Sequence, residues 1–305
     1  MQTYNYDGKV LTIYANTGVH DYCNQKGINI SDFNSPVIIS EGVENCSCMF
    51  GDCSSFNQPV VIPNSVKLCG DMFWGCKSFN SPVIIPDGVT QCERMFDECE
   101  SFNSPVIIPD SVTNCRCMFS DCSSFNQPIV LPNRIKLCYG MFLNCKSFNQ
   151  HVTIPDSVTD CSNMFAGCTS FNQPVHVGLA VKYCTSMFKD CISLNSPVII
   201  SDSVIYCIQM FRHCTSFNQP VAIPDSVTDC SQMFYCCTKF NQPVTIPDSV
   251  IDCTNMFDTC RSLKQQISVP ESIECYDKMF YDCPGELNYI TRVYTPGDYG
   301  ETSLF

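Results

Sequence analysis

A methionine-phenylalanine pair recurs every 23 residues along this chain, beginning at Met49-Phe50 and ending at Met279-Phe280. The eleven copies keep this interval without a slip. Most pairs stand in the frame C-x-x-M-F-x-x-C, and a second block, S-F-N-Q-P-V-x-I-P-D-S-V-T, follows. A fixed period of about 20–50 residues is typical of solenoids, in which each repeat buries its apolar face only against its neighbours. We therefore predict one solenoid of about eleven repeats over residues 23–283.

The composition argues against several classes of function. The net charge is −13 and only 15% of residues are charged. Such an acidic chain is repelled by phosphate backbones and anionic lipids, so we predict no nucleic-acid partner. No segment approaches the roughly 18 apolar residues of a transmembrane helix, which predicts no membrane insertion. The first residues also lack the charged start, apolar core and cleavage site of a signal peptide.

The 26 cysteines follow the same period, with eleven at one repeat position and eleven at a second. The spacing i, i+3, i+4, i+7 is one face of an α-helix, and it is occupied by Cys46, Met49, Phe50 and Cys53. On a helix, the two cysteines of one repeat lie about 10 Å apart, too far for a disulfide. We predict a short helix per repeat and buried free thiols. Disulfides between repeats remain an alternative; a metal is disfavoured because C-x-x-C is absent and histidines do not recur with the cysteines.

A short strand is predicted after each helix, because V-x-I alternates between two prolines, as in residues 105–109. Strands at the same position of every repeat must pair in parallel and in register. An asparagine also recurs at the turn before each strand, and we interpret this column as a ladder of hydrogen bonds to turn backbone groups. Its members are Asn34, Asn57, Asn80, Asn103, Asn126, Asn149, Asn172, Asn195, Asn218 and Asn241.

The frame I-P-D-S-V-T-x-C-x-x-M-F-x-x-C-x-S-F resembles the BspA-like, or Treponema-type, leucine-rich repeat over residues 23–283. Its M-F and F-N-Q elements are similar to surface-protein repeats of mycoplasmas and of some large viruses. The resemblance implies an α/β solenoid, a leucine-rich-repeat-like array with one short parallel β-strand and one short helix per repeat. It also implies a non-enzymatic binding role, often adhesion to host surfaces. The chain departs from the family in having Cys before the helix, Met for Ala, and Phe-Asn where Leu is common.

The two ends break the repeat. We predict an N-terminal cap at residues 1–22, with a hairpin around Asp7-Gly8, and a C-terminal cap and tail at residues 284–305. Attachment to a larger assembly is the alternative role of these ends. Buried thiols and the missing signal peptide together favour a virion, or an extracellular surface reached after lysis, with the cytoplasm as the alternative.

The outward position of the strand is the most informative variable column, because it is aliphatic in the first half of the chain and mostly polar afterwards. Five aliphatic side chains at about 100 Å² each make a stripe of about 500 Å², large for an exposed patch. The alternative is that β-branched residues simply suit the outer face of a sheet. Our candidate partner-binding residues are Ile38, Val61, Ile84, Ile107, Val130 and His176.

Catalytic residue patterns are not evident. We find no Ser-His-Asp set, no phosphate-binding glycine loop and no paired carboxylates, and we predict no cofactor, no metal and no enzyme activity. Three hypotheses remain: a host-recognition or adhesion module that binds a protein or glycan on a host surface, a structural virion protein that docks on another virion protein, and an intracellular scaffold.

Overall fold

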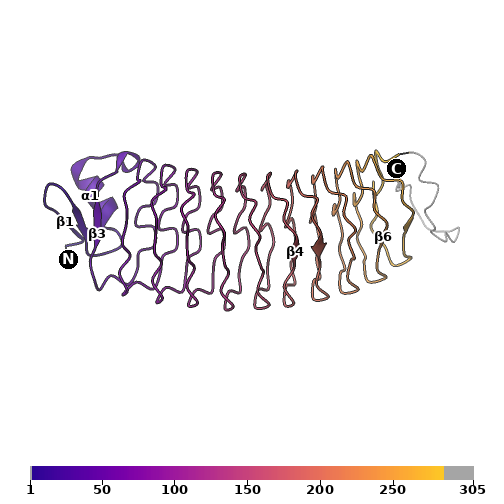
Figure 1. Cartoon of the computed structure of the whole chain (residues 1–305), viewed down its shortest axis with the longest axis horizontal. Coiled ribbons are helices and arrows are strands. Elements are labelled where there is room, and N and C mark those ends of the chain that lie inside the picture. The colour runs from indigo at the N-terminus through magenta and orange to yellow at the C-terminus, as the bar shows by residue number, and fades with distance from the viewer. Residues whose placement is uncertain (1, 285–305) are drawn as a thin grey trace. The chain divides into compact units, whose positions relative to one another are not determined.

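The computed structural model describes residues 2–284 and divides into two compact halves, Met1–Pro155 and Asp156–Phe305, which we describe separately. Within each half, the chain returns to the same positions once per repeat, as the successive coils in Figure 1 show. We call each coil a rung. The solenoid predicted from the 23-residue period is therefore confirmed.

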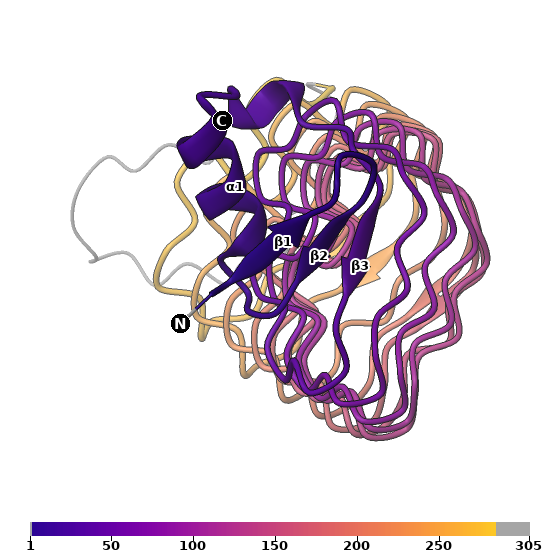
Figure 2. The ribbon, with the colours of Figure 1, turned by 90° about the vertical axis from the view of Figure 1, so that its left-hand side faces the viewer.

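The N-terminal half begins with an antiparallel hairpin of β1 (Tyr4–Tyr6) and β2 (Leu11–Ile13). β2 then pairs in parallel with β3 (Val37–Ile39), so the hairpin continues the strand ladder (Figure 2). The helix α1 (Gly18–Lys26) and the 3-10 turn η1 (Ile30–Asp32) connect β2 to β3. The hairpin forms where Asp7-Gly8 predicted it, whereas α1 crosses the predicted boundary after residue 22. The tail predicted at residues 284–305 lies, from residue 285 on, outside the described residues.

The V-x-I segments that form strands pair in parallel and in register, as the fixed period requires, whereas others, such as residues 60–62 and 106–108, are extended without an assigned strand, so the strand predicted in every repeat is only partly present. In the C-terminal half, β4 (Val175–His176) pairs with β5 (Val198–Ile199), and β6 (Val244–Thr245) pairs with β7 (Ile267–Ser268). A second ladder of parallel bridges joins residues that precede the first cysteine of the repeat, from Asn45 to Leu68 and onwards. Each rung is thus held to its neighbours on more than one side.

The predicted helix in each repeat is wrong, because residues 46–53 and their equivalents form consecutive turns. The N–H of Met49 donates to the Cys46 carbonyl oxygen at 3.1 Å, three residues back, but the N–H of Cys48 donates to Gly70 of the next rung at 3.0 Å. Backbone N–H groups therefore alternate between their own turn and the neighbouring rung. Helices pack about 8–10 Å apart, whereas the stacked rings of Phe50 and Phe73 on neighbouring rungs have centroids only 5.2 Å apart. Stacked helices do not fit this spacing.

Two columns of left-handed residues make these turns possible. At the third position of the frame, Cys48 has φ 57°, and at the seventh, Asp52 has φ 60°. The same two positions have positive φ in every repeat, although only three of the residues there are glycine, namely Gly75, Gly140 and Gly167. A side chain in this region costs roughly 1–2 kcal/mol. The lateral hydrogen bonds of the rungs offset this cost.

Two columns of phenylalanine fill the core together with the methionines. All Met-Phe pairs are buried. In the N-terminal half, the rings of Phe50 and Phe73 are nearly parallel, at 6°. Phe56, from the second column, packs against Phe50 with a centroid distance of 4.5 Å. The C-terminal half repeats this arrangement at Phe234 and Phe257, 5.5 Å apart.

The second cysteine column has a specific role. The Cys76 thiol donates to the carbonyl oxygen of Phe50 on the preceding rung at 3.0 Å, and Cys99 donates to Phe73 in the same way at 3.1 Å. All 26 cysteines are free, which confirms the predicted thiols. Burial raises the pKa of Cys283, in this second column, to about 12, and that of Cys46 and Cys92, in the first column, also to about 12. These thiols remain protonated, and the second column serves as a ladder of buried hydrogen-bond donors.

The asparagine column forms the predicted ladder. The side-chain oxygen of Asn34 accepts the backbone N–H of Asn57 at 2.9 Å, and Asn57 does the same for Asn80 at 2.8 Å. In the C-terminal half, Asn172 accepts the N–H of Asn195 at 2.8 Å. The amide thus satisfies one turn N–H per rung.

A glycine substitution distinguishes these turns from a helix. Glu98 has φ 60°, so Glu98→Gly should raise the free energy of unfolding by about 0.5–1 kcal/mol, because glycine has no Cβ to strain. In an exposed helix the same change would lower it by about 1 kcal/mol. Denaturant titration measures the difference. Ser101→Gly, at a position without positive φ, is the matched control and should destabilise the chain; destabilisation by Glu98→Gly would contradict the turn geometry.

The buried thiols of both columns also predict unfolding in alkali. Below pH 9 the stabilisation is fully present, because thiols are neutral in both states. As the pH rises above 9, the unfolded chain releases thiol protons that Cys46 and Cys92 retain until about pH 12. Each such thiol then lowers the free energy of unfolding by about 1.4 kcal/mol per pH unit. We expect near-ultraviolet circular dichroism, recorded with reductant, to show cooperative unfolding between about pH 9 and 11.

Salt separates this effect from charge repulsion. At 1 M NaCl, where screening acts within about 3 Å, repulsion between surface charges is suppressed but thiol ionisation is not. The alkaline transition should persist there. A chain that stays folded at pH 11 would show that the thiols do not control this transition.

Candidate functional site

The outward strand column of the N-terminal half is an exposed aliphatic stripe. Ile38 is 56% exposed, Val61 82%, and Ile84, Ile107 and Val130 are each 84% exposed. The strand residues on either side of each are buried, as the V-x-I alternation predicts. The first five candidate residues therefore share one surface, at one residue per rung. We call this surface the aliphatic stripe.

The stripe is bordered by two further columns. A column of exposed prolines, two residues before each stripe residue, widens the apolar surface. Its members are Pro36, Pro59, Pro82, Pro105 and Pro128. Three residues after the stripe, Glu41, Asp87 and Asp110 are exposed carboxylates, and the other two rungs have Asn64 and Asn133 at this position. The sequence analysis missed this acidic column, although the Pro-Asp dipeptide that recurs after the strand could have indicated it.

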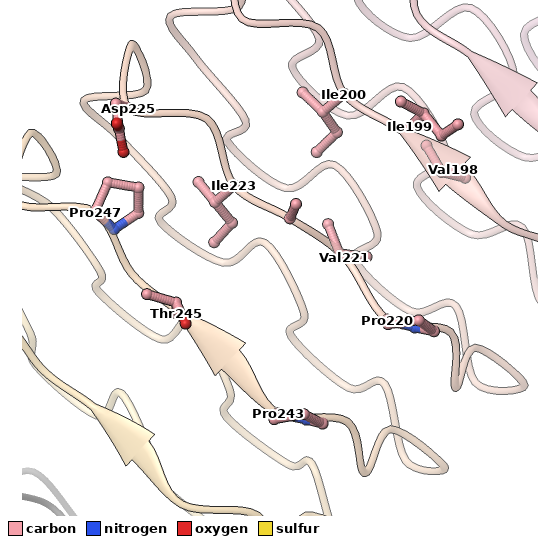
Figure 3. A pocket seen from close by; sticks show the side chains of 11 residues that line it. Val198, Ile199, Ile200, Pro220, Val221, Ile223, Asp225, Pro243, Thr245 and Pro247 are labelled. Atoms are coloured by element: carbon pink, nitrogen blue, oxygen red, sulfur yellow. The ribbon is translucent and has the colours of Figure 1, made fainter.

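The same face of the C-terminal half is more polar and is hollowed. The sixth candidate, His176, is exposed on β4, next to Ile199 of β5. The small side chain of Ala222 follows on the next rung, and a shallow pocket of about 580 Å³ opens there. Figure 3 shows Ile199 and Thr245 on the strands that flank it, with Pro220 and Pro243 at one end. The five stripe residues and His176 thus belong to different halves and differ in chemistry.

A histidine-carboxylate pair lies on the turn segment of the C-terminal half. His213 Nδ1 is 2.8 Å from Asp190 Oδ1, and Cys236 occupies the same repeat position one rung later. The order Asp, His, Cys resembles a catalytic arrangement, but among residues 2–284 no hydrogen bond joins His213 to the Cys236 thiol. We therefore assign no catalysis to these residues.

Metal sites and membrane spans can be assessed over the same residues. Within the described part of the chain, no group of three or more His, Cys, Asp or Glu residues is placed to hold a metal ion. No helix in residues 2–284 is long and apolar enough to cross a membrane.

Solved structures share this fold. A leucine-rich repeat protein from Bacteroides ovatus is 24% identical with a TM-score of 0.61, over 83% of this chain and 71% of that one. A leucine-rich repeat protein from Eubacterium ventriosum is 14% identical with a TM-score of 0.53, over 99% of this chain and 97% of that one. These likenesses confirm the leucine-rich-repeat-like solenoid. No curated protein matches the chain.

A family profile matches overlapping stretches along nearly the whole repeat region. The matched residues are 24–106, 64–154, 86–177, 133–221, 180–269 and 209–288. The mycoplasma-type features noted in the M-F and F-N-Q elements agree with this match. The chain therefore belongs to the family described as "Mycoplasma protein of unknown function, DUF285".

Proposed function

We propose that the chain is a non-enzymatic recognition module whose aliphatic stripe binds a partner protein on a host surface. The observation that carries this proposal is the alignment of five exposed aliphatic residues on successive rungs. The stripe exposes about 500 Å², and the proline column adds to it, which approaches the roughly 800 Å² per partner of a standard interface.

The apolar area of the stripe limits the free energy that it can contribute to binding. Burial of about 500 Å² of apolar surface contributes about 12 kcal/mol before association costs. Those costs amount to roughly 4–15 kcal/mol. The stripe alone therefore supports weak binding, and tighter binding requires the bordering columns. Shape complementarity to the proline column would supply part of that requirement.

The acidic column defines the charge of the partner. Glu41, Asp87 and Asp110 border the stripe along one side, and the whole chain carries a net charge of −13. Complementary potentials steer association and exclude like-charged surfaces. The partner we infer is a protein with an apolar ridge bordered by lysine or arginine. Binding should weaken as salt rises, because the column is exposed to solvent.

We further propose that the module is carried on a virus or phage particle, or on a cell surface. Folding with 26 free thiols suits a reducing compartment, and lysis would then release the chain. A structural virion protein that docks through its ends, and an intracellular scaffold, are the competing functions. Neither competing function requires the stripe to bind cells.

Two substitutions in the stripe test the proposal. Ile84→Asp and Ile107→Asp would each bury an unpaired carboxylate in the interface, which costs about 2–5 kcal/mol, or roughly 30-fold to 4,000-fold in affinity. The measurement is binding of the fluorescently labelled chain to a panel of cultured animal and bacterial cells, before and after trypsin treatment of the cells. Wild type should bind at least one trypsin-sensitive surface, and both variants should not.

Thr245→Asp provides the matched control, because Thr245 is exposed at the same repeat position but in the C-terminal half. It should bind as wild type does, and all three variants should keep the wild-type melting temperature, since each residue is exposed. Undiminished binding by both stripe variants would refute the role of the stripe. Failure of the wild-type chain to bind any cell would instead favour the virion or scaffold functions.

A further inference from the structure

A second surface lies on the turn segment of the C-terminal half and uses none of the outward strand residues. It is a pocket of about 520 Å³. The residues that line it combine two aromatic rings with amide, hydroxyl and charged groups. They are Arg212, Gln232, Tyr235, Asn255, Asp258, Thr259, Lys278 and Tyr281. This mixture of flat apolar surfaces and polar groups differs from the purely aliphatic stripe.

The carboxylate of Asp258 is the most unusual group in this pocket, because it is nearly buried without a cation. Asp258 is only 6% exposed, and its carboxylate accepts a hydrogen bond from the Thr259 hydroxyl at 2.7 Å. No ion pair involves Asp258 among residues 2–284. A buried carboxylate is costly unless donors satisfy it. The lining of the pocket thus leaves acceptor capacity for a ligand.

Asp97 shows how the same repeat position is satisfied elsewhere. Asp97 stands at the position of Asp258 in the N-terminal half and is 7% exposed. There Arg94 Nε donates to the Asp97 carboxylate at 2.9 Å, and the guanidinium also lies over the ring of Trp74. In the C-terminal half the residue equivalent to Arg94 is Asn255, which carries no charge. The replacement leaves the carboxylate without its ion pair.

Two tyrosines stand on either side of Asp258. Tyr235 and Tyr281 occupy the same repeat position one rung before and one rung after it, so they lie about 10 Å apart. The Arg212 guanidinium, from the rung before Tyr235, lies 4.7 Å from the Tyr235 ring centroid. Tyr281 is 52% exposed. The neighbouring Cys236 thiol and the Asp258 carboxylate raise the pKa of Tyr235, so its hydroxyl stays protonated.

We propose that this pocket binds the hexopyranose ring of a glycan between Tyr235 and Tyr281, with ring hydroxyls donating to Asp258. A pyranose has apolar C–H faces that pack on aromatic rings and vicinal hydroxyls that both donate and accept hydrogen bonds. Asn255 and Gln232 offer amides of matching chemistry. A quaternary ammonium group also binds aromatic rings, but Arg212 and Lys278 disfavour a cation in this pocket.

Saturation-transfer NMR tests the proposal on the whole chain. The probes are the methyl glycosides of glucose, galactose, mannose and N-acetylglucosamine, with choline as the opposing probe. We expect transfer to at least one glycoside, reduced at least five-fold in Tyr281→Ala and Asp258→Asn. Tyr206→Ala removes a partly exposed tyrosine outside the pocket and should keep the signal. Circular dichroism checks that each variant folds; if Asp258→Asn does not, Tyr281→Ala decides.

Three results would overturn the proposal: no transfer to any glycoside, equal transfer in wild type and Tyr281→Ala, or a Tyr281-dependent signal from choline instead. Ile84→Asp should leave glycoside transfer unchanged, because Ile84 belongs to the aliphatic stripe. Loss of cell binding with retained glycoside transfer would therefore separate the two surfaces. The outcome for the pocket does not depend on the function proposed for the stripe.

Discussion

The short distance between neighbouring rungs is the constraint on which the rest of the structure depends. Within each half, stacked rings such as Phe73 and Phe96 have centroids 5.6 Å apart, and backbone N–H groups bond directly to the next rung. At this spacing each core residue meets its own equivalents, so the core is built from columns of identical or closely similar side chains, with Leu194 and Leu263 replacing Phe in one column. Each phenylalanine stacks on the equivalent ring of the next rung. Each asparagine side chain accepts the backbone N–H of the equivalent asparagine, and the cysteine thiol donates to a phenylalanine carbonyl oxygen of the preceding rung.

The same constraint explains which parts of the fold were predictable. The period predicted the register of the strands and the buried Met-Phe columns, because both follow from repetition alone. The free thiols were also predicted, but in part from the spacing of a helix that the structure does not contain. The helix was wrong because the inward positions i, i+3, i+4 and i+7 also face inward in two consecutive turns. The left-handed backbone at positions such as Arg94 and Glu98 could not be predicted, because these positions are not occupied by glycine. These residues accept the strain because their neighbours' lateral hydrogen bonds fix the turn.

For the candidate surfaces, the sequence was sufficient where a single column decides the chemistry. The aliphatic stripe follows from the outward slot, and the acidic column beside it was visible in the same alignment of repeats. The tyrosine pocket was not, although Tyr235, Asp258 and Tyr281 share one column, because the sequence does not show that the Asp258 carboxylate is nearly buried between the two rings. Its significance also depends on the absence of an arginine at Asn255, which can be judged only once the contact between Arg94 and Asp97 is known.

In a stack of rungs of this kind, the residues that stabilise the fold differ from the residues available for recognition. Positions that face the core must match their equivalents on both neighbouring rungs, so a substitution there disturbs several contacts and destabilises the fold. Surface positions need only tolerate their neighbours, as Ala222 does between Ile199 and Thr245. One surface substitution can therefore open a pocket or release a buried carboxylate without disturbing the stack. Replacement of the arginine seen at position 94 by Asn255 illustrates this, since the phenylalanine stack beneath continues from Phe234 through Phe257 to Phe280. Binding specificity can then change from rung to rung while the core remains constant.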